Sequence, residues 1–505
     1  MSTRGARAMA GIAAAAVSVG VAQLLAAAFG PQSDVRTAVG SAVIDRTPGP
    51  VKDWAISTFG TADKLALTVM VLVVIAALAA VAGVLESRRR PWGSAVIVLA
   101  GVVGCAAVLS RAGATVVDVA PTLVGTACGV AALRLLVSGR FGDAADGPGT
   151  DEGRRLSLVT LGLLGAGVAS GVVGAVVGRW TSSVSGDREA FTLPKPGRAA
   201  PPIPDTVQPK GVELPSFVTR NADFYRIDTA LTVPQLSRQD WRLRIHGMVD
   251  REIELRFPDL ERFEVVEKVV TLTCVSNPVG GDLISNAVWT GYRVRDLLAE
   301  AGVQPDADMV LSMSVDGWTA GTPVEALTGA DALLAIGMNG EPLPTEHGYP
   351  ARLVVPGLYG YVSATKWVTD LEVTRFDRAQ AYWTRLGWSA RGPIKTASRI
   401  DVPRAGQDVP VGPVTFGGVA WAQNRGVRAV EVQIDDGQWQ PATLGEAYSG
   451  DTWRLWSFPW DAREPGFHRI TVRATDNAGY TQTSERADPV PDGATGWHSI
   501  TFVVR

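Results

Sequence analysis

The chain has 505 residues, of which 47 are basic and 50 are acidic, so its formal net charge is −3. Charged residues make up 19% of the chain, below the ~25% usual in soluble domains, and the mean hydropathy is +0.14. The near-neutral charge argues against nucleic acid as a partner. Three cysteines exclude a disulfide framework, and 46% apolar residues exclude a largely disordered chain.

Long apolar runs without a charged residue fill residues 1–180. Because a bilayer-spanning helix needs ~20 apolar residues, we expect an all-α transmembrane region of about five helices there. The runs are Met9–Phe29, Leu65–Leu85, Pro91–Ser110, Val119–Leu133 and Leu156–Gly178. Four runs follow the first one, so a cleaved signal peptide explains it poorly.

Basic residues flank these runs unevenly. Arg4 and Arg7, Arg88–Arg90, and Arg140 with Arg154 and Arg155 all fall on one side if the amino terminus is cytoplasmic. Five spans then place everything after Trp180 outside the cytoplasm. The predicted location is therefore the cell membrane, multi-pass, with the C-terminal part extracytoplasmic.

Arg154 and Arg155 stand directly before the last apolar run. A paired arginine at this place is typical of a twin-arginine export signal, but it also satisfies the positive-inside rule. The two interpretations stay open on this stretch alone. An export signal gains support if the following domain has to fold around a cofactor before it crosses the membrane.

Three further segments follow the apolar runs. Residues 181–213 are rich in proline and predict an extended linker. Residues 214–386 mix β-like runs with one helical pattern, which predicts an α+β domain. Its expected strands are Trp241–Ile245, Glu267–Cys274, Arg352–Val355 and Trp367–Val373, and its expected helix is Tyr292–Ala301. Residues 387–505 alternate in short strands and predict an all-β, immunoglobulin-like sandwich.

Cys274 is the only cysteine outside the apolar runs, since Cys105 and Cys128 lie within them. It ends an apolar strand and enters a loop with Gly280 and Gly281, whose missing side chains allow a ligand to approach closely. Its thiolate suits a nucleophile or a soft metal ligand. A buried cysteine that only packs is the alternative.

A second cluster surrounds His347, Arg352 and Lys366, in an irregular segment punctuated by Gly and Pro. These three donors suit an anionic ligand such as a phosphate. A turn-rich connection with solvated charges is the alternative. A nucleophilic pair of Cys274 with His347 is also open at this point.

Several spaced motifs occur in one order: Cys-x-x-Asn from Cys274, Asn-Ala-Val-Trp-Thr-Gly ending at Gly291, and Met-Asn-Gly, His-Gly-x-Pro-x-Arg and Lys-Trp between Met338 and Trp367. With them, residues 214–505 resemble the sulfite oxidase family of molybdopterin enzymes, in an actinobacterial-type membrane-anchored form. The resemblance implies a molybdenum–molybdopterin cofactor and a catalytic metal ligand at Cys274. It also implies that Asn277, His347, Arg352 and Lys366 bind the cofactor, and that the closing sandwich resembles the family's often dimer-forming domain.

The resemblance implies a two-electron oxygen-atom transfer on a small molecule. No haem or iron–sulfur motif is present and no histidine precedes His246, so electrons would pass to or from a separate cytochrome or quinone-linked protein. The arginines and tyrosine that hold sulfite in the family are not matched by Phe224–Leu231, by Trp388-Ser389 or by Pro489–Gly493. Sulfite, an S-oxide and an N-oxide therefore stay open as substrates.

Two other classes of function remain from the sequence. A cofactor-free binding or assembly protein would keep the scaffold and lose the metal. A cysteine hydrolase would use Cys274 with His347, but it also needs an oriented third group and an oxyanion hole.

Overall fold

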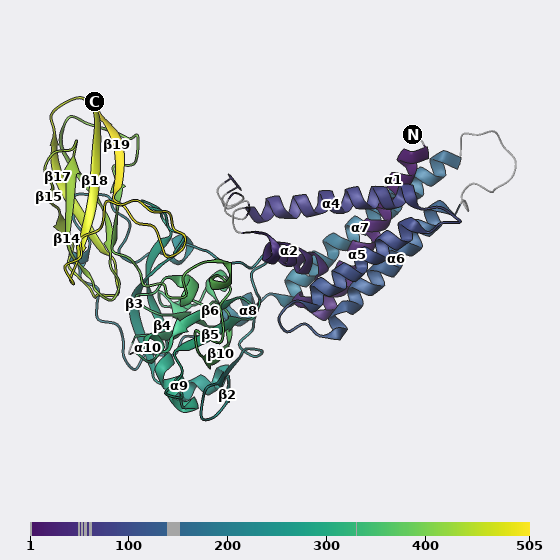
Figure 1. Cartoon of the computed structure of the whole chain (residues 1–505), viewed down its shortest axis with the longest axis horizontal. Coiled ribbons are helices and arrows are strands. Elements are labelled where there is room, and N and C mark those ends of the chain that lie inside the picture. Colours follow the sequence, from purple (N-terminus) through teal and green to yellow (C-terminus); the bar gives the residue numbers. More distant parts are fainter. Residues whose placement is uncertain are drawn as a thin grey trace. The chain divides into compact units, whose positions relative to one another are not determined.

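The computed structural model of the chain divides into two compact units (Figure 1). The structure describes residues 3–48, 51, 54, 58–59, 63–138, 152–329 and 331–505. Unit 1 contains residues 1–183 and 230–233, and unit 2 contains residues 184–229 and 234–505. The two units are described separately below.

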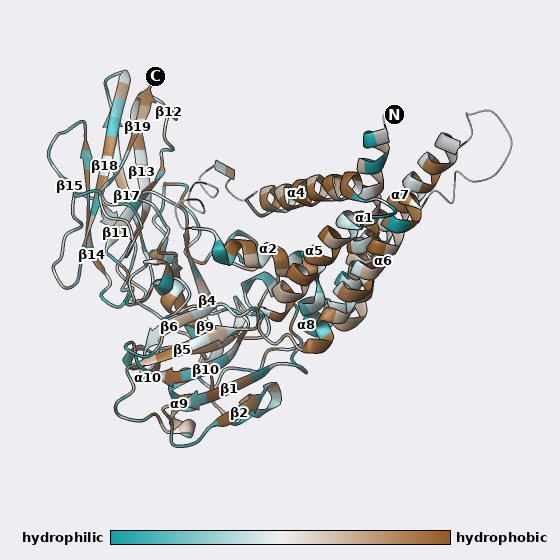
Figure 2. Ribbon diagram, turned by 45° about the vertical axis from the view of Figure 1, so that its right-hand side comes forward, coloured by the Kyte–Doolittle hydropathy of each residue, from teal (hydrophilic) through white to brown (hydrophobic). Residues whose placement is uncertain are grey.

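Unit 1 is built from long helices. They are α1 (Thr3–Phe29), α2 (Val35–Arg46), α4 (Asp63–Leu85), α5 (Trp92–Leu109), α6 (Ala120–Val137) and α7 (Glu152–Ser182). Among the described residues, five helical segments are long and apolar enough to cross a membrane, and they coincide with the five predicted runs. Many of their large apolar side chains are exposed, and the helices are mostly brown, the colour of hydrophobic residues, in Figure 2. The five-helix prediction is confirmed at the level of helices.

Close backbone contacts hold α1 against its neighbours. A Cβ added at Gly11 would collide with the backbone of Ala79 and Gly83 on α4, and one at Gly20 would collide with Gly167 on α7. Helices can approach this closely only where side chains are missing, which is a packing mode frequent among membrane helices. The glycines and alanines of these runs therefore fix which helices meet.

The predicted export signal lies at the start of α7, which includes Arg154 and Arg155 in its first turns. The side chains of both arginines lie outside the described residues, and so does the whole of Arg140. The export prediction is therefore untested by the structure.

The first part of unit 2 is an α+β domain with two sheets. One sheet has the order β3-β4-β7-β8, with β9 paired to β7, and the other has the order β2-β1-β10-β5-β6. The first sheet contains β3 (Val265–Thr273), β4 (Ile284–Arg293), β7 (Leu333–Met338), β8 (Glu341–Pro342) and β9 (Arg352–Val354). The second contains β1 (Arg242–Gly247), β2 (Ile253–Arg256), β5 (Met309–Ser314), β6 (Thr319–Pro323) and β10 (Val368–Thr374). The short helices of this part are α8 (Ser185–Glu189), α9 (Val294–Ala301) and α10 (Val324–Thr328).

The predicted elements of this domain are confirmed within one or two residues at most ends, as β1, β3, β9 and β10. The helical pattern corresponds to α9, which starts two residues later than predicted and buries Val294, Leu297 and Leu298. These side chains recur every three or four residues, so one face of the helix closes the domain core.

The C-terminal part of unit 2 is a β-sandwich. Its first sheet has the order β11-β13-β17-β16 and its second the order β12-β19-β18-β14-β15. The first consists of β11 (Ala397–Val402), β13 (Gly412–Trp421), β16 (Thr443–Leu444) and β17 (Arg454–Ala462). The second consists of β12 (Asp408–Val409), β14 (Val427–Ile434), β15 (Gln440–Pro441), β18 (Gly466–Asp476) and β19 (His498–Val504). Phe416 and Trp456 from one sheet pack with Val432 and Phe502 from the other. The all-β prediction is confirmed, and the immunoglobulin-like assignment stays a prediction.

The proline-rich segment predicted as a linker contains α8 near its start, continues without long helices or strands, and packs against the rest of unit 2. Val184 is buried in a core cluster of unit 2, Phe191 packs against the same cluster, and Val207 is buried beneath the sandwich. Arg188 donates hydrogen bonds to the carbonyl oxygens of Leu343 and Pro342. From Val184 onward the segment therefore belongs to the packing of unit 2. Its composition could not predict this, because composition does not show which surface its few apolar side chains will contact.

Candidate functional site

Cys274 directly follows β3 and opens the loop that connects β3 to β4. Its side chain is buried, with the residue 9% exposed, and its backbone N–H donates to the carbonyl oxygen of Leu283 at 3.0 Å. Burial raises the pKa of the thiol, while hydrogen bonds from Ser276 and the charge of Lys366 act in the opposite direction. A buried thiol near a cation is a suitable soft ligand for a metal.

Asn277 closes the loop that begins at Cys274. Its backbone N–H donates to the carbonyl oxygen of Cys274 at 3.1 Å, and its side-chain Oδ1 accepts a hydrogen bond from the N–H of Leu283 at 3.0 Å. The side chain therefore fixes the loop, and its Nδ2 is left pointing away from that bond. Any contact of Asn277 with a cofactor stays a prediction.

The structure brings His347, Arg352 and Lys366 together. Arg352 donates to the carbonyl oxygen of His347 at 3.1 Å, and Lys366 donates to the carbonyl oxygen of Glu346 at 3.1 Å. Gly348, at φ +111°, lies between them, because a Cβ there would be 3.0 Å from the Cβ of Arg352 and 3.1 Å from that of Lys366. The left-handed backbone at Gly348 thus lets two cationic side chains approach one point.

Burial shifts the charges of this cluster. It lowers the pKa of Arg352 to about 10 and that of Lys366 to about 8, the latter in spite of the opposing charge of Asp228. Burial also lowers the pKa of His347 to about 3, with Arg352 and Lys366 acting in the same direction. At neutral pH the cluster therefore has two cations and a neutral imidazole, with Asp228 as the acid paired to Lys366 at 3.3 Å.

His347 has one nitrogen without a partner. Its Nε2 lies 3.3 Å from the carbonyl oxygen of Asn221, which can only accept, so Nε2 carries the proton. Its Nδ1 is buried and forms no hydrogen bond with any residue that the structure describes. A buried polar atom of this kind costs free energy unless a ligand or water satisfies it.

Tyr225 interacts electrostatically with both Cys274 and Arg352, although no motif in the sequence marked it. Burial raises the pKa of its hydroxyl. The charge of Cys274 adds to this rise, and the charge of Arg352 opposes it. Arg226, next along the chain, pairs with Asp228 at 2.8 Å and is 40% exposed. The segment that lacks the family's substrate arginine therefore does not supply Arg226 to the thiol in its place.

Asn221 accepts the hydrogen bond from His347 and is itself held in place by Asn339. Asn339 donates to Oδ1 of Asn221 at 2.8 Å and to the carbonyl oxygen of Thr219 at 2.9 Å. Its backbone is left-handed, with φ +52°, which asparagine tolerates better than most residues. The Met-Asn-Gly motif contained this signal, but Asn221, 118 residues earlier, had no local pattern to mark it.

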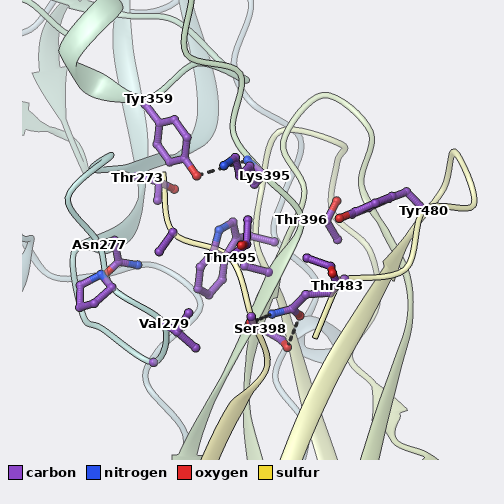
Figure 3. A pocket seen from close by; sticks show the side chains of 17 residues that line it. Thr273, Asn277, Val279, Tyr359, Lys395, Thr396, Ser398, Tyr480, Thr483 and Thr495 are labelled. Atoms are coloured by element: carbon purple, nitrogen blue, oxygen red, sulfur yellow. Dashed lines mark hydrogen bonds between the residues drawn. The ribbon is translucent and has the colours of Figure 1, made fainter. Parts of the chain in front are cut away.

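A small, partly open pocket lies between the loop after Cys274 and the sandwich (Figure 3). Thr273, Asn277 and Val279 line it from one side, and Thr396, Ser398 and Thr483 from the other. Among the lining residues the charged side chain is Lys395, which pairs with Asp492 at 2.8 Å. Its partner Asp492 lies in Pro489–Gly493, the segment that lacks the family's substrate arginine, and no motif in the sequence marked Lys395.

Trp388 stands where the family has a tyrosine, and it has no hydroxyl to offer a substrate. It packs against Tyr361, with ring centroids 5.8 Å apart, and against Trp383. Tyr359 instead contributes a phenol to the pocket, where its oxygen accepts a hydrogen bond from the N–H of Lys395 at 3.3 Å.

Comparison with known proteins identifies the domain that contains these residues. Residues 230–383 match the model of the oxidoreductase molybdopterin binding domain. The chain is 36% identical over 152 residues to the uncharacterized oxidoreductase YuiH of Bacillus subtilis, covering 30% of this chain and 74% of YuiH. The chain belongs to the sulfite oxidase family of molybdopterin-binding oxidoreductases.

Other members of the sulfite oxidase family match over a longer stretch. Human mitochondrial sulfite oxidase is 31% identical over 364 residues, which cover 61% of this chain and 65% of the human protein. A solved structure, the sulfane dehydrogenase SoxCD of Paracoccus pantotrophus, matches with 26% identity and a TM-score of 0.48, covering 54% of this chain and 76% of that one. The sulfite oxidase family predicted from the sequence is confirmed, and the actinobacterial-type membrane-anchored form stays a prediction.

Proposed function

We propose that the chain is a membrane-anchored molybdenum oxidoreductase acting on a small substrate, either sulfite or an S- or N-oxide. The observation that carries the proposal is a buried thiol near two buried cations, of which Lys366 pairs with Asp228 and Arg352 pairs with no carboxylate among the described residues. Such a cluster is unfavourable by itself, because burying an unbalanced charge costs free energy. A bound anion next to a soft metal would offset that cost.

The described residues fit a pterin that has a phosphate. Arg352 and Lys366 would bind the phosphate through charge-assisted hydrogen bonds, and the bare Nδ1 of His347 would accept an N–H of the pterin ring. Cys274 would bind the metal. Among the described residues no group of three or more His, Cys, Asp or Glu side chains is placed to hold a metal ion, so the remaining ligands would come from the cofactor.

When bound, the molybdenum centre supplies a two-electron oxygen-atom transfer, in which the metal alternates between Mo(VI) and Mo(IV). The chain's own residues would exclude water, orient the cofactor and admit the substrate. The pocket beside Asn277 is the proposed substrate entrance. Its cation, Lys395, is already neutralised by Asp492, which favours an oxide of low charge over a dianion without excluding sulfite.

The five apolar helices are proposed to anchor unit 2 at the outer face of the cell membrane, in contact with lipid. The distribution of arginines in the sequence supports this orientation, and export of a folded, cofactor-containing domain supports a signal at Arg154 and Arg155. Electrons would pass to or from a separate cytochrome or quinone-linked protein. A homodimer formed through the sandwich, taken as immunoglobulin-like, completes the proposal.

The first experiment is to measure molybdenum and pterin in the full chain, purified in detergent from a host that makes the cofactor. About one molybdenum per chain would support the proposal, and a substrate screen would then begin with sulfite and with sulfoxides. A folded chain with neither molybdenum nor pterin would contradict it and would favour a cofactor-free binding protein. The hydrolase alternative has less support, since His347 contacts Asn221 and has no hydrogen bond to Cys274 among the described residues.

A further inference from the structure

Strand β3, which ends one residue before Cys274, receives hydrogen bonds from a residue outside its own domain. Gln423, which follows β13 of the sandwich, donates to the carbonyl oxygen of Thr271 at 3.2 Å and to Oγ1 of Thr273 at 3.0 Å. Gln423 is fully buried. The two acceptors are the residues three and one positions before Cys274, so a sandwich side chain reaches the end of β3.

The sandwich also pairs with the open edge of β3. In its sheet β3 is an edge strand, with β4 on one side only. On the other side the N–H of Thr271 donates to the carbonyl oxygen of Asp451 at 3.0 Å, and its hydroxyl accepts from the N–H of Trp453 at 2.8 Å. The last residues of β3 before Cys274 therefore form hydrogen bonds along both edges of the strand.

The loop after Cys274 is clamped in the same way. Arg399, on β11, donates to the carbonyl oxygen of Gly281 at 2.8 Å, and its Nε pairs with Asp401 at 2.7 Å. The ring of His498, on β19, fills the space where a Cβ of Gly280 would be. His498 is itself fixed, because its Nδ1 accepts the N–H of Ile400 at 3.0 Å.

We propose that the sandwich is a positioning element of the metal site, acting through Gln423, Arg399 and His498 on the two segments that present Cys274. This inference rests on the proposed function for its metal, but the placement of the thiol can be tested without any metal. Residues that orient a metal ligand tune the metal's affinity and its electronic properties. A displacement of about 1 Å at a reacting centre is enough to lower turnover severely.

A role limited to domain packing explains these contacts less well. Oε1 of Gln423 is buried and has no hydrogen-bond partner among the described residues, which costs free energy, and an apolar side chain would seal the interface without that cost. The polar contacts also concentrate at Thr271, Thr273 and Gly281, on both sides of Cys274. Contacts that served only to pack the two domains together would not be expected to concentrate next to Cys274.

The test uses the full chain in detergent, loaded with cofactor, and four variants. Gln423→Met and Arg399→Met remove the donors to β3 and to the loop. Gln433→Met and Arg454→Met are matched controls, since Gln433 donates to Gly437 and Arg454 to Gly445 and Val427, all within the sandwich.

We expect the two positioning variants to keep at least half of the parental molybdenum. They should change the g-values of the Mo(V) electron paramagnetic resonance signal and its midpoint potential, and lower turnover about tenfold. A rescue variant made in addition to these four, Arg399→Lys, keeps one donor and should recover part of the parental spectrum. The controls should match the parent. A parental spectrum and potential in both positioning variants would overturn the proposal.

A second measurement covers variants that fail to load cofactor. In the chain made without cofactor, the alkylation rate of Cys274 is followed by mass spectrometry of its own peptide, apart from Cys105 and Cys128. We expect alkylation about tenfold faster in Gln423→Met and Arg399→Met than in the parent and the controls, with all rates measured at a temperature well below every thermal midpoint. Equal rates in all five proteins refute the positioning role, whereas a parent without molybdenum refutes the proposed function alone.

Discussion

Arg352 gives the sharpest prediction, because its replacement should have opposite effects in the empty and the loaded protein. The guanidinium is 4% exposed and makes one hydrogen bond of ordinary length, to His347 at 3.1 Å, with two longer contacts at 3.4 and 3.5 Å. No carboxylate among the described residues pairs with it. Burial lowers its pKa from 12.5 to about 10, so the folded empty chain is strained by a charge that a ligand is expected to balance.

The magnitude follows from that pKa. Arginine is protonated at pH 7 in both states, and its folded pKa lies below its unfolded value, so the charge disfavours folding by about 3 kcal/mol. This cost is complete below pH 10 and fades as the pH rises toward 12.5. The hydrogen bonds of the side chain return about 1–2 kcal/mol. Arg352→Met should therefore stabilise the cofactor-free chain by about 1–2 kcal/mol.

The loaded protein should respond in the other direction. Each charge-assisted hydrogen bond to a phosphate contributes about 1.5–3 kcal/mol, so Arg352→Met should lose most of its pterin on purification. The assay compares chains made with and without the cofactor, by thermal unfolding followed through tryptophan fluorescence and by pterin content. In the parent, added pyrophosphate should raise the midpoint of the empty chain, and in the variant it should not.

Arg293 is the matched control. It is about as buried as Arg352 but pairs with Glu264 at 2.6 Å, so its charge is already balanced. Arg293→Met therefore removes a satisfied hydrogen bond and should destabilise the empty and the loaded chain alike. If Arg352→Met destabilises the empty chain as much as Arg293→Met does, or retains pterin at the parental level, the buried arginine is not an anion site and the reasoning fails.

Three further predictions concern other parts of the chain. Cys274→Ser should lower molybdenum content and abolish turnover while most pterin stays bound, and unchanged molybdenum would show that the thiol is not a ligand. Burial, with a smaller effect of nearby arginines, lowers the pKa of His498 to about 4. Because the unfolded chain takes up this proton near pH 6.5, stability should fall by up to about 3 kcal/mol between pH 6.5 and 4. His498→Gln should flatten that part of the stability curve, and identical slopes would contradict the assignment. Replacing Arg154 and Arg155 by lysine keeps the positive charges but should prevent export of cofactor-loaded unit 2, as judged by protease accessibility in spheroplasts; normal export would remove the signal hypothesis.

The sequence by itself determined the elements whose pattern is local. Long uncharged runs predicted the apolar helices, because a span of ~20 residues needs no information from elsewhere in the chain. Alternation such as that of Val430, Val432 and Ile434 predicted the strands of the sandwich, because side chains on a strand point to opposite faces in turn. The motifs around Cys274 and His347 indicated the family, since each lies within one short segment.

Only the tertiary structure decided which distant side chains share the site. Gln423 and Thr273 are 150 residues apart, and Arg399 and Gly281 are 118 residues apart. Lys366 obtains its acid from Asp228, 138 residues earlier, and the predicted linker gains its packing from a surface that exists only after folding. The physical reason is that a buried polar group needs one specific partner in space. Periodicity records only which face of an element is buried, so it cannot say which partner that face will meet.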